Sequence, residues 1–336
     1  MICRRCLARL LLPTVLLGLL AGLVLLPQAI SRWRQQPSDA RLLTATSRSF
    51  PVTVVDALGR KVVVPHRPLR IISLAPCVTE ILFAIGAGNQ VIANTSYCNY
   101  PPEAARREKI GGYLDPDVER VAALSPDLVL GARGNRREAI EQMQALRLTV
   151  ITVDANNLEE VAQAIRLIGR VVGEENAAGK LAVELDARRK ALLARTRHLA
   201  EARRPRTLFL FSFEGLFSAG AGSHIDELIR LAGGRNIAAR TGAPWPQLSM
   251  EAIVSADPQV ILLLSGHGAK TRLSAQAALG RLRVDPRWRT ISAVKRGRLA
   301  VLEDDLITIP GPRLIEGLEA TAAALHPELF CKRARL

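Results

Sequence analysis

The sequence predicts an α/β fold in which two similar lobes, each with a Rossmann-like parallel sheet, are joined by a long rigid α-helix and enclose a ligand cleft. Short apolar runs alternate with helical periodicity, a stretch without strands divides the chain, and the two halves share motifs. Near-continuous apolar strands that alternate with amphipathic helices are typical of parallel sheets covered on both faces. A chain of 336 residues is also long enough to bury two cores.

The N-terminus has the pattern of an export signal or a membrane anchor. Three arginines precede an unbroken apolar run over residues 10–26. A run of about 17 residues is at the short limit for crossing a bilayer, and Leu23 stands where a lipoprotein would carry its lipidated cysteine. Residues 1–30 are therefore predicted to be a cleaved signal peptide or an uncleaved anchor, followed by a linker over 31–50. Both alternatives place the rest of the chain outside the cytoplasm, in the periplasm or at the cell surface.

Residues 51–156 are predicted to form the N-terminal lobe. The segment 51–65 alternates β-branched residues around a turn that contains glycine, which is typical of a hairpin. From Arg70 onward, helical periodicity separates four short runs rich in Val, Ile and Leu: RIISL, QVIANT, DLVLGA and LTVITVD. We expect these four runs to be parallel strands of one sheet.

Residues 157–203 are predicted to be the connecting helix. The stretch opens on Asn157 with an acid three residues later, which is typical of a helix start, and apolar residues then recur at helical spacing. The pattern fits one long helix, or two helices joined near Gly173. Beyond it, RTLFLFSF, QVILLLS and RLAVLEDD are the expected strands of a C-terminal lobe over 204–326, with a tail over 327–336.

The two halves of the chain resemble each other in sequence. Glu80 precedes Gly86 by six residues, and Glu227 precedes Gly233 by the same step. The segments VERVAALSPDLVL and MEAIVSADPQVIL likewise share a glutamate, a branched residue and a proline before a strand. Such a repeat indicates two lobes of similar fold. In an open parallel sheet the ligand lies beyond the carboxyl ends of the strands, so two facing lobes place those ends around one cleft.

The composition is strongly basic, with a formal net charge of +15 and a pI near 10.6. This charge is compatible with an anionic partner. The basic residues are spread along helical faces, however, and aromatic residues make up only 4% of the chain, so a surface for stacking bases is not predicted. We therefore expect a solvated basic surface and no nucleic-acid partner.

Cys77 raises the question of catalysis, because it follows a predicted strand at a sharp turn before a helix. A nucleophile needs a base, and the five histidines are scattered with no acid or amide spaced to orient one of them. We therefore expect no enzyme activity, no resident cofactor and no metal site. Cys77 could pair with Cys98 in an oxidising compartment, and two separate buried thiols are the alternative.

Several motifs resemble those of the cobalamin- and ferric-siderophore-binding proteins of ABC importers. The likeness is carried by P-x-x-T-E in APCVTEIL, S-Y-x-x-Y-P-P in SYCNYPPEA and W-P-Q-x-S-x-E in PWPQLSMEA, and it extends from about Val52 to Leu325. The resemblance implies a monomer with two lobes on a rigid helix, which captures a cobalt corrinoid outside the cytoplasm and delivers it to an ABC permease and its ATPase. A haem or another iron chelate, such as a ferric siderophore, is the alternative ligand within the same fold.

The same resemblance implies roles for individual residues. Glu80 and Glu251 match two glutamates, one on the outer tip of each lobe, that dock against arginines of the permease. A carboxylate in the first turn of a helix is also favoured by the helix macrodipole. The residues expected to bind the ligand lie in loops after strands or match aromatic contacts of the family: Tyr97, Tyr113, Arg133, Phe213, Phe217 and Trp245. Ala132 departs from the pattern, since cobalamin binders carry a tryptophan there.

Two other classes of function stay open at this point. A thiol hydrolase of the cell envelope would use Cys77, whereas a membrane-tethered scaffold module would bind no ligand. Within the binding-protein interpretation, His224 or His267 could contact a haem or a corrinoid.

Overall fold

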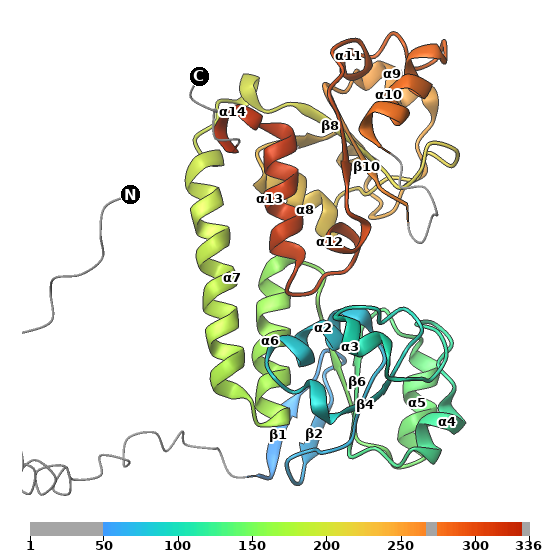
Figure 1. The fold of residues 1–336 in the computed structure, drawn as a ribbon, viewed down its shortest axis with the longest axis vertical. Helices are drawn as coiled ribbons and strands as arrows, with labels where there is room; N and C mark the ends of the chain where they lie inside the picture. The colour runs from blue at the N-terminus through green and yellow to red at the C-terminus, as the bar shows by residue number, and fades with distance from the viewer. Residues whose placement is uncertain (1–49, 267–273, 331–336) are drawn as a thin grey trace, which may run out of the picture. The chain divides into compact units, whose positions relative to one another are not determined.

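The structure is a computed structural model that describes residues 50–266 and 274–330 (Figure 1). All of these residues belong to one unit of the chain by their contacts. They form two lobes, each with its own parallel sheet, and a small antiparallel hairpin, so the predicted α/β class is confirmed. No helix within the described residues combines the length and the hydropathy of a membrane span, and the apolar run over 10–26 lies outside them.

The sheet of the N-terminal lobe has five parallel strands in the order β5-β4-β3-β6-β7. The strands are β3 (Ile71–Ser73), β4 (Val91–Asn94), β5 (Glu108–Lys109), β6 (Leu128–Ala132) and β7 (Val150–Val153). Every residue of β6 and β7 is buried, as expected for parallel strands covered on both faces. The four predicted strands are confirmed, whereas β5 was not predicted because two residues are too few to show a pattern.

Helices connect these strands: α2 (Pro76–Ala84), α3 (Pro102–Ala105), α4 (Val118–Ala123) and α5 (Arg137–Ala145). Helix α2 begins on Pro76, where the missing N–H costs no helical hydrogen bond. Six consecutive residues of α2, from Cys77 to Leu82, are buried. This helix therefore lies in the interior of the protein along most of its length.

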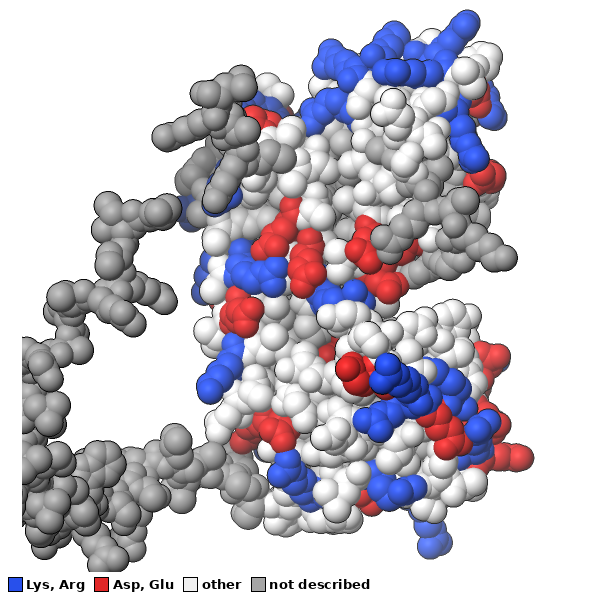
Figure 2. Space-filling model, in the orientation of Figure 1, with Lys and Arg blue, Asp and Glu red and all other residues white. Residues whose placement is uncertain are grey.

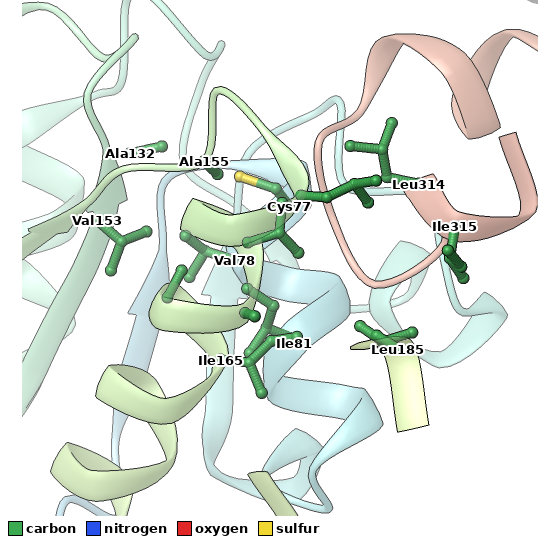
Figure 3. Packing of buried hydrophobic residues seen from close by; sticks show 14 of the residues in the cluster. Cys77, Val78, Ile81, Ala132, Val153, Ala155, Ile165, Leu185, Leu314 and Ile315 are labelled. Carbon is green, nitrogen blue, oxygen red and sulfur yellow. The ribbon is translucent and has the colours of Figure 1, made fainter. Parts of the chain in front are cut away.

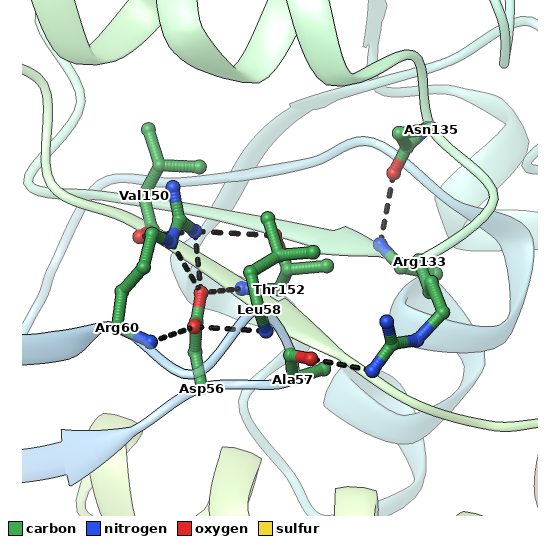
Figure 4. Close-up of polar contacts among 9 residues, drawn as sticks. Asp56, Ala57, Leu58, Arg60, Arg133, Asn135, Val150 and Thr152 are labelled. Atoms are coloured by element: carbon green, nitrogen blue, oxygen red, sulfur yellow. Dashed lines mark hydrogen bonds and ion pairs between the residues drawn. The ribbon is translucent and has the colours of Figure 1, made fainter.

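The hairpin of β1 (Val52–Val55) and β2 (Lys61–Val64) is tied to β7 by a polar network (Figure 4). The Asp56 carboxylate accepts hydrogen bonds from the backbone N–H of Thr152 at 3.2 Å and of Arg60 at 3.0 Å, and it also binds the Arg60 guanidinium. Burial acts to raise the pKa of Asp56, but the bonds from Arg60 and Thr152 together hold it below its usual value. The predicted hairpin is therefore confirmed, and its turn is anchored to the sheet.

The connecting segment consists of two helices, α6 (Leu158–Val172) and α7 (Glu175–Thr196), which is one of the two predicted arrangements. Asn157 caps α6, because its side chain accepts a hydrogen bond from the backbone N–H of Glu160 at 2.9 Å. Gly173 ends α6 in the left-handed conformation, with φ of 81°. Helix α7 packs against α6 and against α13 of the C-terminal lobe, and so it runs beside both lobes (Figure 1).

The C-terminal lobe has a four-stranded parallel sheet in the order β11-β10-β8-β9. Its strands are β8 (Arg206–Leu210), β9 (Arg235–Asn236), β10 (Val260–Leu264) and β11 (Leu299–Leu302). Its helices are α8 (His224–Leu231), α9 (Met250–Ala256), α10 (Ala275–Val284), α11 (Ser292–Lys295), α12 (Asp304–Thr308), α13 (Leu314–Leu325) and α14 (Pro327–Phe330). The three predicted strands are confirmed, and the two-residue strand β9 was again too short to predict.

One hydrophobic core continues from the N-terminal lobe into the C-terminal lobe. Figure 3 shows Cys77 of α2 beside Leu314 at the start of α13, with Ile81 and Ile165 packed below them. Leu314 and Ile165 have no exposed surface. Complete burial of such a side chain contributes roughly 1.5–3 kcal/mol. Shared apolar packing at the junction therefore opposes wide separation of the two lobes.

Candidate functional site

The loops at the carboxyl ends of the N-terminal strands are tied together by one buried amide. Asn135 accepts a hydrogen bond from the backbone N–H of Ala132 at 2.8 Å. Its Nδ2 donates to the carbonyl oxygens of Leu74 at 3.0 Å and of Tyr113 at 2.8 Å. A single side chain thus connects the loops after β3, β5 and β6. The sequence placed Asn135 in a candidate loop but carried no signal for this role, because its partners in the other two loops, Leu74 and Tyr113, are 61 and 22 residues away.

Arg133 lies at the end of β6, as expected from the loop position, but its guanidinium is already engaged (Figure 4). It binds both carboxylate oxygens of Asp154, with Nη2 to Oδ2 at 2.7 Å, and it donates to the carbonyl oxygen of Ala57. The hydrogen bonds with Asp154 raise the pKa of Arg133. About half of the side chain remains exposed. An anionic group of a ligand would therefore share this arginine with Asp154.

The two tyrosines expected to bind the ligand differ in exposure. Tyr97 is 62% exposed, and it follows β4 at the carboxyl edge of the sheet. Tyr113 is half-buried and packs against the core, where burial and then the nearby Cys77 raise the pKa of its hydroxyl to about 12. A Cβ at Gly134 would lie 2.0 Å from the Tyr113 hydroxyl oxygen, so this glycine makes room for the ring. The Tyr97 ring is therefore accessible to a ligand, whereas the Tyr113 ring is held in place by the core residues around it.

Aromatic rings also gather at the carboxyl end of β8 in the C-terminal lobe. Trp245 is 51% exposed, and its ring centroid lies 6.0 Å from that of Phe211 and 5.8 Å from that of His224. Phe217 is about half exposed, and its carbonyl oxygen accepts a hydrogen bond from the backbone N–H of Phe211 at 3.0 Å. Trp245 and Phe217 are thus held by the same segment. They are the exposed aromatic candidates of this lobe.

Phe213 was expected beside these residues, but it packs toward the core of its lobe. Its ring lies edge-on to Trp288 with the centroids 6.0 Å apart, and Trp288 is buried. This contact lies on the α10–α11 side of β8. This packing argues against Phe213 as a ligand contact, because a ring that packs against the core leaves less of its surface for a ligand.

His224 is buried below Trp245 and bonded within the protein. Its Nε2 lies 2.9 Å from the carbonyl oxygen of Ile307, and because a carbonyl can only accept, Nε2 carries the hydrogen. Burial lowers the pKa of His224, so the imidazole is neutral at pH 7. His267 lies outside the described residues. Within residues 50–266 and 274–330, no three His, Cys, Asp or Glu side chains are grouped so as to hold a metal ion.

Glu80 does not lie on an exposed tip, so the predicted position is wrong. The residue is 3% exposed, and Arg313 donates to both of its carboxylate oxygens at 3.1 and 2.6 Å. Burial raises the pKa of Glu80, and the bonds from Arg313 act in the opposite direction. Two hydrogen bonds from one guanidinium are the arrangement in which a carboxylate is most strongly stabilised in its ionised form. The prediction failed because the residue that buries Glu80 is more than two hundred positions away in the chain.

Glu251 is exposed in the first turn of α9, where the prediction placed it. Ser249 caps the helix by accepting a hydrogen bond from the backbone N–H of Ala252 at 3.1 Å. The backbone N–H of Glu251 itself, and then the Ser249 hydroxyl, lower the pKa of this carboxylate. Glu251 is thus an ionised carboxylate that a partner can reach, whereas Glu80 is enclosed.

Cys77 and Cys98 are both buried and free, so the pairing that the sequence left open does not occur in this structure. Cys98 accepts a hydrogen bond from the Thr79 hydroxyl at 3.1 Å. Burial, and then the charge of Glu80, raise the pKa of Cys77 to about 12. A thiol in this environment is a poor nucleophile, because only the thiolate attacks. The geometry therefore gives no support to a hydrolase that uses Cys77.

Two surface grooves lie away from these strand ends. One, of about 440 Å³, is between the hairpin and α6, and the other, of about 250 Å³, is between α6 and α7. The lining side chains of both are aliphatic, polar or charged, and none is aromatic. On the face drawn in Figure 2, the surface is also hollowed between the two lobes. The aromatic candidates from the sequence belong to the strand ends and to neither groove.

Basic side chains gather over α10 and α11 at the far end of the C-terminal lobe (Figure 2). Arg281, Arg283, Arg287, Arg289, Lys295 and Arg296 are all exposed. The tryptophan of this region, Trp288, is buried. Among the described residues, this cluster therefore has charge but no exposed ring on which a base could stack.

The comparisons with known proteins agree with this geometry. A family model described as periplasmic binding protein matches residues 71–306. The chain belongs to the periplasmic binding protein family. The uncharacterized ABC transporter substrate-binding lipoprotein YvrC of Bacillus subtilis is 32% identical to it over 304 residues, which cover 88% of this chain and 92% of the relative. The family predicted from the motifs is thereby confirmed.

Two solved structures of this family share the fold. The periplasmic vitamin B12 binding protein BtuF of Vibrio cholerae matches with a TM-score of 0.68 and 27% identity, over 78% of this chain and 98% of that one. The periplasmic heme-binding protein RhuT of Roseiflexus sp. RS-1, in its apo form, matches with a TM-score of 0.66 and 27% identity, over 77% and 98%. The two matches are nearly equal in TM-score and identity, so likeness of fold does not indicate whether the ligand is a corrinoid or a haem.

Proposed function

We propose that this chain is the extracytoplasmic binding component of an ABC importer and that it captures a flat metal chelate, with a cobalt corrinoid as the first candidate. The observation that supports this most is the presence of half-exposed aromatic rings at the strand ends of both lobes, Tyr97 in one and Trp245 in the other. Large aromatic side chains gain free energy when a ligand covers them, and a planar guest can contact two such faces at once. The names of the relatives, a vitamin B12 binder among them, support the same class.

Haem or a ferric siderophore is the second candidate ligand. Ala132 removes a tryptophan wall that the cobalamin binders have, and a structural neighbour of equal similarity binds haem. Without that tryptophan the site has less aromatic area to contact a corrinoid, which weakens the preference for a corrinoid over another chelate. The two candidates differ in ligand and not in mechanism.

Capture in this proposal uses preformed loops. Asn135 fixes the N-terminal loops, and the core that is shared across the lobe junction keeps their separation within a narrow range. Preformed contacts lower the entropy cost of binding. Release then requires work from outside, which the permease and its ATPase supply. Glu251 is the exposed carboxylate through which a permease arginine would dock.

Titration of the full-length chain in mild detergent with cyanocobalamin, cobinamide, haemin and a ferric hydroxamate tests the proposal. We expect saturable quenching of tryptophan fluorescence by one class of chelate. The quenching should be reduced in the variant Trp245→Phe, which retains Trp33 and the buried Trp288. Absence of saturable binding to every chelate, measured also by calorimetry, would exclude this function and favour the scaffold.

A further inference from the structure

The repeat in the sequence is also a repeat in the structure. Glu80 lies on α2, which follows the strand β3, and Glu227 lies on α8, which follows the strand β8. The glycines six residues later, Gly86 and Gly233, have φ of 87° and 85°, so each helix is followed by the same left-handed turn. The two glutamates therefore occupy corresponding positions in the two lobes.

Each glutamate contacts the N-terminus of a helix, and that helix packs on the lobe opposite to the glutamate's own lobe. Glu80 of the N-terminal lobe binds Arg313, the N-cap residue of α13, which packs on α8 and β11 of the C-terminal lobe. Glu227 of the C-terminal lobe accepts a hydrogen bond at 2.9 Å from the backbone N–H of Leu158, the first residue of α6. Helix α6 packs on α2 and β1 of the N-terminal lobe. The partial positive charge of a helix N-terminus favours a carboxylate at both places.

At the start of α13, Arg313 also contacts a second residue of the N-terminal lobe. The Arg313 guanidinium carbon lies 3.8 Å from the centroid of the Tyr100 ring, and Tyr100 is in the loop that also carries Tyr97. A Cβ at Gly311 would lie 3.0 Å from Oε2 of Glu80, so glycine allows the segment before α13 to approach α2 closely. One arginine of the C-terminal lobe thus holds a helix and a candidate ligand loop of the N-terminal lobe.

The contact between Glu227 and the start of α6 is linked to Arg133, the charged residue that we expect to bind the ligand. Leu158 follows the segment that contains Asp154, and Asp154 binds Arg133 at the end of β6. Asn157 satisfies one backbone donor at the start of α6, and Glu227 satisfies another from across the lobe junction. The contact of Arg313 therefore reaches the loop that carries Tyr97, and the contact of Glu227 ends on a segment whose Asp154 binds Arg133.

We propose that Glu80 with Arg313, and Glu227 with the start of α6, are a reciprocal pair of positioning contacts that set the distance between the ligand-binding loops of the two lobes. The proposed effect on affinity rests on the binding function proposed above. The effect on the distance between the lobes does not, because both contacts are formed by the protein alone. Neither glutamate needs to touch the ligand.

The test is a distance measurement on the ligand-free, full-length chain. Spin labels are attached at two exposed positions, Glu141→Cys on α5 and Lys295→Cys on α11, with the cysteines at 3, 6 and 331 replaced by serine and the two buried cysteines retained. We expect a single narrow distance distribution in the parent protein. It should broaden in Arg313→Gln and in Glu227→Ala, and broaden further when the two changes are combined.

A matched control removes an ion pair that lies within one lobe. Arg120→Gln breaks the exposed contact of Arg120 with Glu108 at 2.9 Å and should leave the distribution unchanged. If Arg313→Gln does not fold, Arg313→Lys keeps the charge without the two-pronged contact and should give a smaller broadening. Unchanged distributions in folded Arg313 and Glu227 variants would overturn the inference.

A second measurement separates this inference from the proposed function. Amide hydrogen exchange at Leu158 should become faster in Glu227→Ala in the absence of any ligand, and an unchanged rate would contradict the contact. With a chelate that binds, the two variants should lose affinity by about tenfold, as expected for residues that act through position. Broadened distributions without any chelate binding would support the positioning contacts and reject the proposed function.

Discussion

In the N-terminal lobe the repeat-related glutamate, Glu80, is met by a guanidinium, whereas in the C-terminal lobe Glu227 is met by a backbone N–H. Burial raises the pKa of both carboxyl groups, and the charge of Arg313 opposes that effect at Glu80. The two lobes therefore have the same acid at the same place in the fold with different means of stabilising it. The difference shows that the repeat preserves the position of a side chain, while the opposing lobe determines its electrostatic environment.

The largest expected loss of stability comes from removing the guanidinium of Arg313. Arg313→Gln leaves the Glu80 carboxylate buried without a charged partner, and loss of one member of a buried ion pair typically costs about 3–5 kcal/mol in the free energy of unfolding. Urea denaturation of the variant measures this cost. The double variant Glu80→Gln with Arg313→Gln should be less destabilised, because no charge is then buried. A double variant as unstable as the single one would show that the pair matters for packing and not for charge.

A smaller effect is expected on the Glu227 side of the comparison. Glu227→Ala leaves the Leu158 N–H at the start of α6 without its acceptor, which should cost about 1–3 kcal/mol in the free energy of unfolding. Glu227→Gln retains a side-chain oxygen in the same place and is the matched control, with a smaller cost. Denaturation that gives equal stability for the alanine and glutamine variants would mean that the hydrogen bond contributes nothing.

The pH dependence of stability should report the raised pKa of Glu227. Burial raises the pKa of Glu227, against the opposing effects of the Leu158 N–H, Arg230 and Arg189. A raised pKa in the folded state stabilises the fold below the unfolded value of about 4.3. That contribution is lost as the pH rises through the folded pKa. The parent protein should therefore lose stability relative to Glu227→Gln as the pH is raised from about 4 to 7, and a difference independent of pH would contradict the raised pKa.

The smallest effect on stability is expected at Glu251, which contrasts with Glu80 because it is exposed. Glu251→Gln should leave the melting temperature and the ligand affinity unchanged and should lower uptake in cells that also contain the cognate permease. The control is Glu138→Gln, which changes an exposed glutamate in the first turn of α5, a position that the repeat does not match to Glu251. Equal uptake by Glu251→Gln and the parent protein would remove Glu251 from permease docking.

Much of the fold could be predicted because its signals are local. Short apolar runs identified every strand of three residues or more in the two parallel sheets, and the turn with Gly59 identified the hairpin. The strands β5 and β9 could not be predicted, since two residues carry no periodicity. The alternative of two helices joined at Gly173 was visible because a left-handed helix end favours glycine.

The candidate site was predicted less completely than the fold. Tyr97 and Trp245 are exposed at the strand ends, but Phe213 packs against the core of its lobe and Glu80 is enclosed. Asn135 could not be identified as a link between loops, because its partner at Leu74 is 61 residues away. Exposure and polar contacts at the site depend on which loops meet, and short-range pattern does not specify that.

The order of hydrophobic and polar residues along this chain is sufficient to specify which segments are strands and helices, which of their faces are buried, and that the halves are related. Those properties arise from neighbours within a few residues, where the spacing of side chains is set by the backbone itself. The environment of Glu80 is different, because its partner lies 233 residues away and meets it only when the two lobes pack together. Whether a carboxylate is a surface charge or a buried contact depends on that long-range packing, since desolvation and pairing occur only in the folded chain.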